Sequence, residues 1–228
     1  AQVGALSTAQ VRALETADLA AMTTAAVASL SSDQATALTT AQVVGLTSTQ
    51  AAVLTSVAVG ALSTAQAAAL QTADLAALTT TAVQALTTAA IANLSTAQVA
   101  GMTTAQVAAL TVDQASKLTA AQVTGMGTAQ VAALTSDQLG AMTDTQVGQF
   151  SVAQIGALTA SQAPGLTSAQ VAALTTAQVA ALETADLAVL GTAQAAALTT
   201  DQVVALGTAQ AAALTTAQVA KLTTAQVA

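Results

Sequence analysis

The chain has 228 residues, of which 54% are hydrophobic and only 6% are charged, and its formal net charge is −7. It contains no histidine, cysteine, tryptophan or tyrosine, and Phe150 is its only aromatic residue. This composition excludes disulfides, thiolate metal sites and histidine or cysteine catalysis, and the lack of a basic patch argues against a nucleic-acid partner.

Stretches long enough to cross a membrane are missing from the sequence. The longest run without a threonine, serine, glutamine, asparagine or charged residue is residues 57–62, about six residues. A transmembrane helix needs roughly 20. We therefore expect no membrane span, and no N-terminal signal segment is visible.

An eight-residue repeat begins at Leu6 and continues without a slip to the end of the chain. We name its positions a to h, with Leu6 at a and Ala13 at h. Position a is Leu in 23 of 28 repeats, position b is Ser or Thr in 22 of 28, and position e is Gln in 22 of 29. Position f is always Val, Leu, Ile or Ala. Such a fixed period is typical of a solenoid.

The period of eight predicts one short helix per repeat rather than one long helix. Eight residues at about 100° each would rotate the leucine stripe by roughly 80° per repeat. Ser or Thr at b followed by Gln at e matches a capping box, and the apolar residues at a and f match a hydrophobic staple. We therefore expect a helix of about two turns that starts after b and ends near h or a in each repeat.

Charged and helix-breaking residues follow the same phase. The ten acids lie at positions b to e and the three bases at g or h, as the dipole of a short helix favours. All twelve glycines lie at g, h or b, and Pro164 lies at g. We expect the chain to turn at these positions.

Helices that change direction by a constant angle trace a superhelix, so the predicted fold is a single all-α solenoid over residues 1–228. Positions a and f are expected to face its axis, with the Thr, Gln and d residues outward or capping. A helix this short is marginal alone, so its stability must come from neighbouring coils.

Three repeats depart from the pattern in the same way, with Asp at e, Leu at f and Glu or Gln at b. They contain Glu15 and Asp18, Gln71 and Asp74, and Glu183 and Asp186, and their starts are separated by multiples of seven repeats. This spacing favours duplication over a spatial repeat. Because b lacks a hydroxyl there, we expect a softer bend.

Other folds remain open on the sequence alone. A β-solenoid is the main alternative, although an alanine-rich repeat without Asn-Gly turns fits it poorly. A long helix or helical hairpins is a second alternative. Disorder is disfavoured because the chain is hydrophobic and carries little charge.

Catalytic, cofactor-binding and metal-binding residues are not predicted anywhere in the chain. Asp137 and Asp144 are the closest carboxylates outside the variant repeats, and nothing accompanies them as an acid–base partner would. Glu15 with Asp18, and Glu183 with Asp186, offer fewer oxygens than the six or more that calcium needs. No glycine-rich phosphate loop is present. We expect no enzyme and no small-molecule substrate.

Two columns of the repeat and one residue could have further roles. The Gln column at e could form ladders between coils besides capping, or a binding face. The threonines at c offer a regular hydroxyl array that could match ice, a glycan or a mineral. Phe150 is expected to fill a local widening rather than to mark a partner site.

The phrase Leu-Thr-Thr-Ala-Gln-Val-Ala-Ala, found at residues 174–181 and again from Leu214, resembles the octapeptide tracts of very large bacterial surface and secreted proteins, often labelled adhesins. The resemblance covers the whole chain and assigns no functional residue. It implies an extracellular or cell-surface structural protein, such as a filament, sheath or adhesin stalk. The alternative is a surface-binding array.

The sequence begins and ends within a repeat and shows no polar terminal cap, as solenoids usually need. We therefore expect either continuation in a longer repetitive chain or self-association into fibres.

Overall fold

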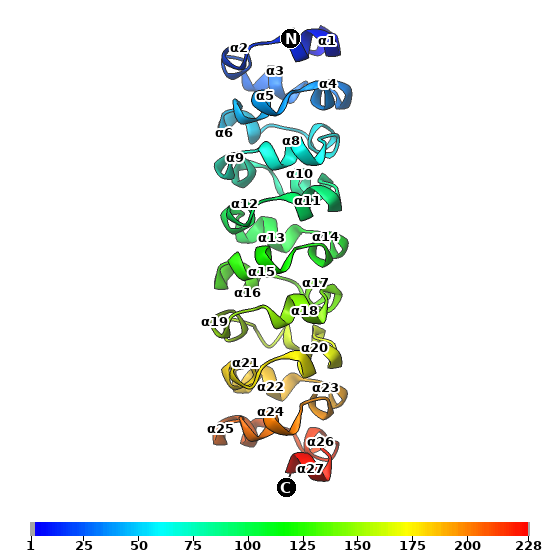
Figure 1. Ribbon diagram of the computed structural model, residues 1–228, viewed down its shortest axis with the longest axis vertical. Helices are drawn as coiled ribbons and strands as arrows, with labels where there is room; N and C mark the ends of the chain where they lie inside the picture. The colour runs from blue at the N-terminus through cyan, green and yellow to red at the C-terminus, as the bar shows by residue number, and fades with distance from the viewer. Residues whose placement is uncertain (1–2, 228) are drawn as a thin grey trace. The chain divides into compact units, whose positions relative to one another are not determined.

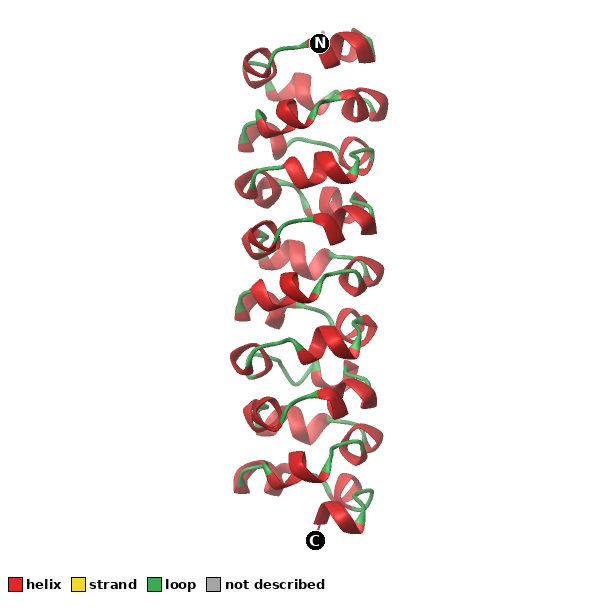
Figure 2. Cartoon of the chain, in the orientation of Figure 1, coloured by secondary structure: helices red, strands yellow, loops and turns green. Residues whose placement is uncertain are grey.

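The computed structural model describes residues 3–227, and all regular structure in that range is helical (Figure 2). The helices are short and follow one another in tandem, and within each of the two units described below they wind as a solenoid (Figure 1). The predicted all-α solenoid is therefore confirmed, and both the β-solenoid and the long helix are wrong. The chain divides into two compact units, which meet in the sequence between Lys117 and Leu118 and are described separately below.

Unit 1 contains one short 3-10 helix and fourteen α-helices of four to six residues. They are η1 (Val3–Ala5), α1 (Thr8–Ala13), α2 (Thr16–Ala20), α3 (Thr24–Ala28), α4 (Ser32–Ala37), α5 (Thr40–Val44), α6 (Ser48–Ala51), α7 (Ser56–Gly60), α8 (Thr64–Ala69), α9 (Thr72–Ala77), α10 (Thr80–Ala85), α11 (Thr88–Asn93), α12 (Thr96–Gly101), α13 (Thr104–Ala109) and α14 (Val112–Ser116).

Unit 2 repeats the same plan with one irregular repeat. Its helices are α15 (Ala120–Gly125), α16 (Thr128–Ala133), α17 (Ser136–Ala141), α18 (Asp144–Gly148), α19 (Val152–Ile155), η2 (Ala163–Gly165), α20 (Ser168–Ala173), α21 (Thr176–Ala181), α22 (Thr184–Val189), α23 (Thr192–Ala196), α24 (Thr200–Val204), α25 (Thr208–Ala213), α26 (Thr216–Val219) and α27 (Thr224–Val227).

Most of the α-helices start with the capping box that the repeat predicts. At α21 the amide of Gln178 donates to Thr175 Oγ1 at 3.2 Å, and the Thr175 amide donates to Gln178 Oε1 at 2.6 Å. Two of the orphan amides at the helix start are thereby satisfied by side chains of the same repeat.

The turn between helices is made by two consecutive extended residues, at a and b. Before α21, Leu174 has φ −64° and ψ 146°, and Thr175 has φ −72° and ψ 160°. No residue in the described part of the chain, glycine included, has a positive φ. Three of the glycines, Gly127, Gly191 and Gly207, do lie in these turns as extended N-caps at b, but the turns do not require glycine, because extended backbone suits any residue.

Coils pack on one another with a constant register in each unit. Helices three repeats apart pack together, as α1 with α4 and α4 with α7 in unit 1, and α20 with α23 and α23 with α26 in unit 2. The glutamines at e donate hydrogen bonds to carbonyls 28 to 31 positions back, in the preceding coil. One turn of the coil therefore takes about three and a half repeats.

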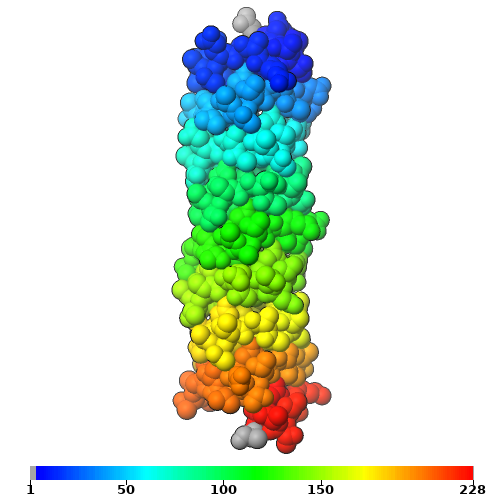
Figure 3. All heavy atoms as spheres, in the orientation of Figure 1, coloured from blue at the N-terminus to red at the C-terminus, as the bar shows by residue number. Residues whose placement is uncertain are grey.

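Positions a and f form the core, as expected. Val107 and Val179 at f are fully buried, and Leu110 and Leu174 at a are 4% exposed. Within each unit, Figure 3 shows the atoms of one coil in direct contact with those of the next. Because a single short helix cannot bury its own apolar face, this contact between coils supplies the burial that it needs.

The variant repeats bend like the others, so the expected softer bend is wrong. The N-cap residues Glu15, Gln71 and Glu183 have φ between −71° and −66° and ψ between 151° and 154°, although none has a side-chain cap bond. Packing between coils holds these turns without the hydroxyl. Within unit 1, Asp18 and Asp74 are seven repeats apart, which equals two turns of the coil and supports the spatial reading of their spacing.

The repeat at residues 158–165 is the irregular one. Pro164 has no amide hydrogen and its ring would clash with the carbonyl of Ala160, so the α-helix cannot form. A turn and the 3-10 helix η2 replace it, with the Gly165 amide donating to the Gln162 carbonyl at 2.9 Å.

Two expectations concern the chain as a whole. The observation that the sequence begins and ends within a repeat rests on Ala1 and Ala228. Both residues lie outside the described part of the chain. A single solenoid over residues 1–228 stays a prediction.

Candidate functional site

The glutamines at position e form the most distinctive feature of both units. They were expected to face outward or to cap, but only the capping role is right. The side chains are buried, as for Gln106 at 1% exposure and Gln170 at 0%. Buried amides need hydrogen-bond partners for all their polar atoms, so the remaining bonds of each amide must lie inside the coil.

In unit 1, Gln42 shows where these bonds go. Its Oε1 accepts the amide hydrogen of Thr39 at 2.8 Å, at the start of its own helix α5. Its Nε2 donates to the carbonyls of Val11 and Leu14, each at 2.8 Å, at the end of α1 in the preceding coil. One side chain therefore caps the start of one helix and the end of another.

Unit 2 has the same arrangement. Gln170 accepts from the Thr167 amide at 2.7 Å and donates to the carbonyls of Leu139 at 2.8 Å and Met142 at 2.6 Å. We call these residues the bridging glutamines. Those with bonds to a preceding coil of their own unit are Gln34, Gln42, Gln50, Gln66, Gln98, Gln106 and Gln114 in unit 1, and Gln146, Gln154, Gln162, Gln170, Gln178, Gln194, Gln202, Gln210, Gln218 and Gln226 in unit 2.

The energetic role of a bridging glutamine follows from burial. A hydrogen bond contributes about 1 kcal/mol net, but a buried group left unpaired costs about 1–3 kcal/mol. Of the two carbonyls that a bridging glutamine bonds, the one at f also accepts the amide hydrogen of the next a residue, as the Leu139 carbonyl does from Met142 at 3.2 Å. The sequence suggested that the glutamines at e could form a ladder between coils in addition to capping. This ladder is therefore a main contact that holds successive coils together.

Asp74 is a departure from this column in unit 1. It is 2% exposed and its Oδ1 accepts from Ser48 Oγ at 2.7 Å, whereas its Oδ2 is buried without a partner. Gln71, at position b of the same repeat, donates from Nε2 to the Val44 carbonyl at 2.7 Å. Neighbouring polar side chains thus replace part of what a glutamine would supply.

Asp186 is the corresponding departure in unit 2. It is 1% exposed, and its Oδ2 accepts the Glu183 amide hydrogen at 3.1 Å. Burial raises the pKa of Asp186 above its ordinary value of 3.8, the Glu183 amide hydrogen bond lowers it, and the Glu183 charge raises it. The sequence marked this residue only as half of a weak calcium pair.

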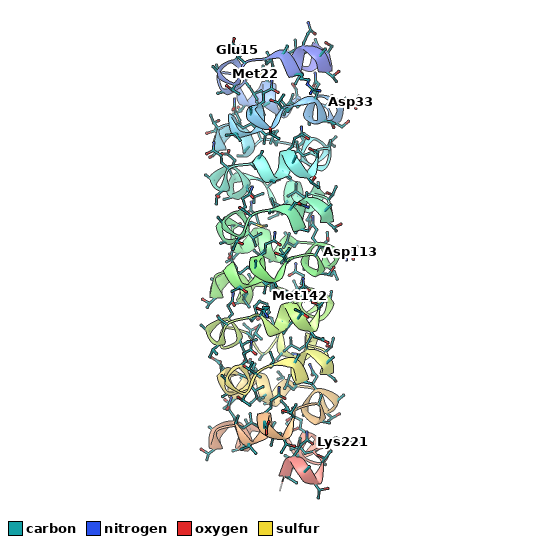
Figure 4. All side chains as sticks on the ribbon, viewed as in Figure 1. Glu15, Met22, Asp33, Asp113, Met142 and Lys221 are labelled. Atoms are coloured by element: carbon teal, nitrogen blue, oxygen red, sulfur yellow. The ribbon has the colours of Figure 1, made fainter. Side chains whose placement is uncertain are left out.

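The other acidic candidates lie where helix dipoles place them. Asp137 and Asp144 are exposed in the first turns of α17 and α18, each on its own helix. Asp18, beside Glu15, is exposed in the first turn of α2. Figure 4 shows Asp33 and Asp113 at the outer edge of the ribbon. Within residues 3–227, no group of three or more acidic side chains is placed to hold a metal ion.

Most threonines at c are exposed, although Thr80 and Thr88 are partly buried, while most of those at b are engaged in capping. Thr104 and Thr176 are examples of exposed c residues. They form the hydroxyl array that the repeat predicts. Phe150 is 2% exposed in the a column, so it lies in the core, as expected of a residue that fills a widening.

The described helices are far too short and polar to span a bilayer. None exceeds six residues, whereas a membrane span needs roughly 20.

A family model described as the ALTTAQ repeat matches the chain five times, over residues 11–48, 67–104, 91–120, 116–144 and 179–216. The matches together span more than half of the chain. No curated protein and no solved structure matches it.

Proposed function

The chain belongs to the ALTTAQ repeat family, and we propose on this premise that it is an extracellular bacterial structural protein that forms a filament, a sheath or an adhesin stalk. Its task would be to give length and stiffness. Part of this proposal is that the chain associates with itself or continues in a longer tract, and that it has no catalytic activity, no small-molecule substrate and no nucleic-acid partner.

The observation that carries the proposal is the constant register of the bridging glutamines. Within each unit the same pair of bonds, to carbonyls 28 and 31 residues back, recurs from coil to coil. A repeat that contacts only its neighbours can be added many times without a new kind of contact. Length is the property that such a repeat can supply.

The sparse positive charge fits an extracellular setting. Only three residues are Lys or Arg, and one of them, Lys221, is labelled in Figure 4. Trypsin-like proteases therefore have few cleavage sites.

Electron microscopy tests the proposal. We expect the purified chain to form elongated particles or fibres at high concentration. Compact, monodisperse particles under the same conditions would contradict it.

The second candidate is a surface that binds ice, a glycan or a mineral through the exposed threonines at c. The bridging glutamines cannot form part of this binding surface because their side chains are buried. Replacing Thr96, Thr104, Thr176 and Thr184 with alanine should abolish such binding and leave circular dichroism unchanged. Binding that survives the four substitutions would remove the candidate.

A further inference from the structure

Asp186 stands at a position where the repeats on either side carry a bridging glutamine. Gln178 donates to the Phe150 carbonyl at 2.6 Å, and Gln194 donates to the Ala163 carbonyl at 3.0 Å. The same register places the carbonyls of Ile155 and Leu158 opposite Asp186. An ionised carboxylate can only accept hydrogen bonds, so it cannot donate to them.

The two donors that assist Asp74 in unit 1 are missing around Asp186. The hydroxyl that donates to Asp74 belongs to a serine in the preceding coil, and the amide that donates to a nearby carbonyl belongs to the glutamine at position b of the same repeat. At the corresponding positions before Asp186 the sequence has Ala160 and Glu183. Neither side chain supplies a donor when Glu183 is ionised.

No positive charge on the packed elements offsets a charge on Asp186. α22 packs against η2 and α25, and neither contains a titratable residue. Glu183, which directly precedes α22, adds a second negative charge. Lys221 follows α26, whose Gln218 donates to the carbonyls of Leu187 and Leu190, and its side chain is exposed.

The carbonyls opposite Asp186 lie at the end of α19 (Val152–Ile155) in the preceding coil. The irregular element η2 lies opposite the next repeat, where Gln194 donates from Nε2 to the carbonyls of Ala163 and Leu166 as the other bridging glutamines do.

We propose that Asp186 makes the contact of α22 with the end of α19 in the preceding coil depend on protonation. With a proton on its carboxyl group, the side chain has one O–H that donates to one of the opposite carbonyls, where a bridging glutamine supplies two N–H donors. Without the proton, the coil contains a buried charge that lacks the assisting donors, and α22 is held less firmly.

The direction of the pH effect follows from linkage. Because burial raises the pKa of Asp186 above its ordinary value, folding binds a proton between that value and the raised one. The stabilising contribution is complete below the ordinary value and is lost as the pH rises through the raised pKa. Acid should therefore tighten this part of unit 2.

Denaturation of the full chain at acidic and neutral pH tests the proposal. Asp186→Gln should raise the urea midpoint at pH 8 and have less effect at pH 4, where a larger fraction of the wild-type carboxyl groups carries a proton. Asp201→Asn, at an exposed acid in the first turn of α24, is the matched control and should show no such gain at pH 8. An equal effect of Asp186→Gln at both pH values would overturn the proposal.

A direct titration keeps the test independent of stability. In ¹³C-carboxyl NMR of the folded chain, Asp186 should titrate above the ordinary value of an aspartate. The double substitution Ala160→Ser with Glu183→Gln, which copies the surroundings of Asp74, should lower the titration midpoint of Asp186. Titration of Asp186 at the ordinary value of an aspartate, or a midpoint unaffected by the double substitution, counts against the proposal.

Discussion

Gln170 donates a hydrogen bond to the carbonyl of Met142, 2.6 Å away and 28 residues earlier in the chain. The same side chain accepts the amide hydrogen of Thr167 at 2.7 Å. Since Gln170 is completely buried, water cannot replace either bond. The end of one helix and the start of another therefore depend on one amide group.

Gln170→Ala should destabilise unit 2 by about 2–4 kcal/mol, because it removes the side-chain partner of the Met142 carbonyl and of the Thr167 amide and opens a cavity. Urea unfolding followed by circular dichroism measures the change. Gln149→Ala, at an exposed glutamine of the same unit, is the control and should stay within about 0.5 kcal/mol of the wild type. Equal effects of the two substitutions would show that the bridge contributes nothing.

The local part of this arrangement can be predicted from the sequence, and the long-range part cannot. Thr167 and Gln170 lie in the same repeat, so both residues of the capping box can be recognised within eight residues, and the pair recurs at the same positions in other repeats. The bond to Met142 depends on the number of residues per turn of the coil. No single repeat encodes that number, since it results from how whole coils pack.

Other departures have similar physical causes. The sequence places glycines around the helix junctions, and those at b are extended N-caps, as at Gly127. The turns themselves need no glycine, because none of the described residues has a positive φ. In the sequence, Asp186 has the position of an ordinary acid in the first turn of a helix. Its burial results from packing against the preceding coil. Only the residues of the preceding coil that lie opposite Asp186 distinguish it from an exposed acid such as Asp18.

Gly127→Ser should stabilise unit 2, since Gly127 is an N-cap with φ −73° and ψ 156° and no side-chain acceptor. The gain should be a few tenths of a kcal/mol over glycine. Gly127→Ala separates the hydroxyl from the backbone effect, and serine should exceed alanine by about 1 kcal/mol. Thermal unfolding of the wild type and the two variants measures these differences. Equal stability of Gly127→Ala and Gly127→Ser would contradict the capping role.

Gly165 and Gly148 should respond in opposite directions to alanine. A Cβ at Gly165 would lie 2.4 Å from the Ser136 carbonyl oxygen, so Gly165→Ala forces η2 away from α17. We expect a loss of about 1–3 kcal/mol. A Cβ at Gly148 would lie 3.8 Å from the Ala173 carbonyl oxygen, and Gly148→Ala should gain up to about 1 kcal/mol from helix propensity. Urea midpoints that shift in the same direction for both variants would be inconsistent with the close approach.

Phe150→Leu should leave a void in unit 2 if the aromatic ring fills a widening of the core. The expected loss is about 1–2 kcal/mol. Met142→Leu, at the preceding a position and 3% exposed, changes shape more than volume and should cost less than about 1.5 kcal/mol. Urea unfolding compares them, and a neutral Phe150→Leu would mean that the ring fills no needed space.

Hydrogen exchange of the glutamine side-chain amides, followed by NMR of the folded chain, tests the bridging glutamines most directly. The Nε2 protons of residues such as Gln42, Gln106 and Gln170 should exchange slowly, because each amide is buried and donates to the preceding coil. Those of the exposed Gln84 and Gln149 should exchange rapidly. If all the side-chain amides exchanged at the same rapid rate, glutamine would not join the coils.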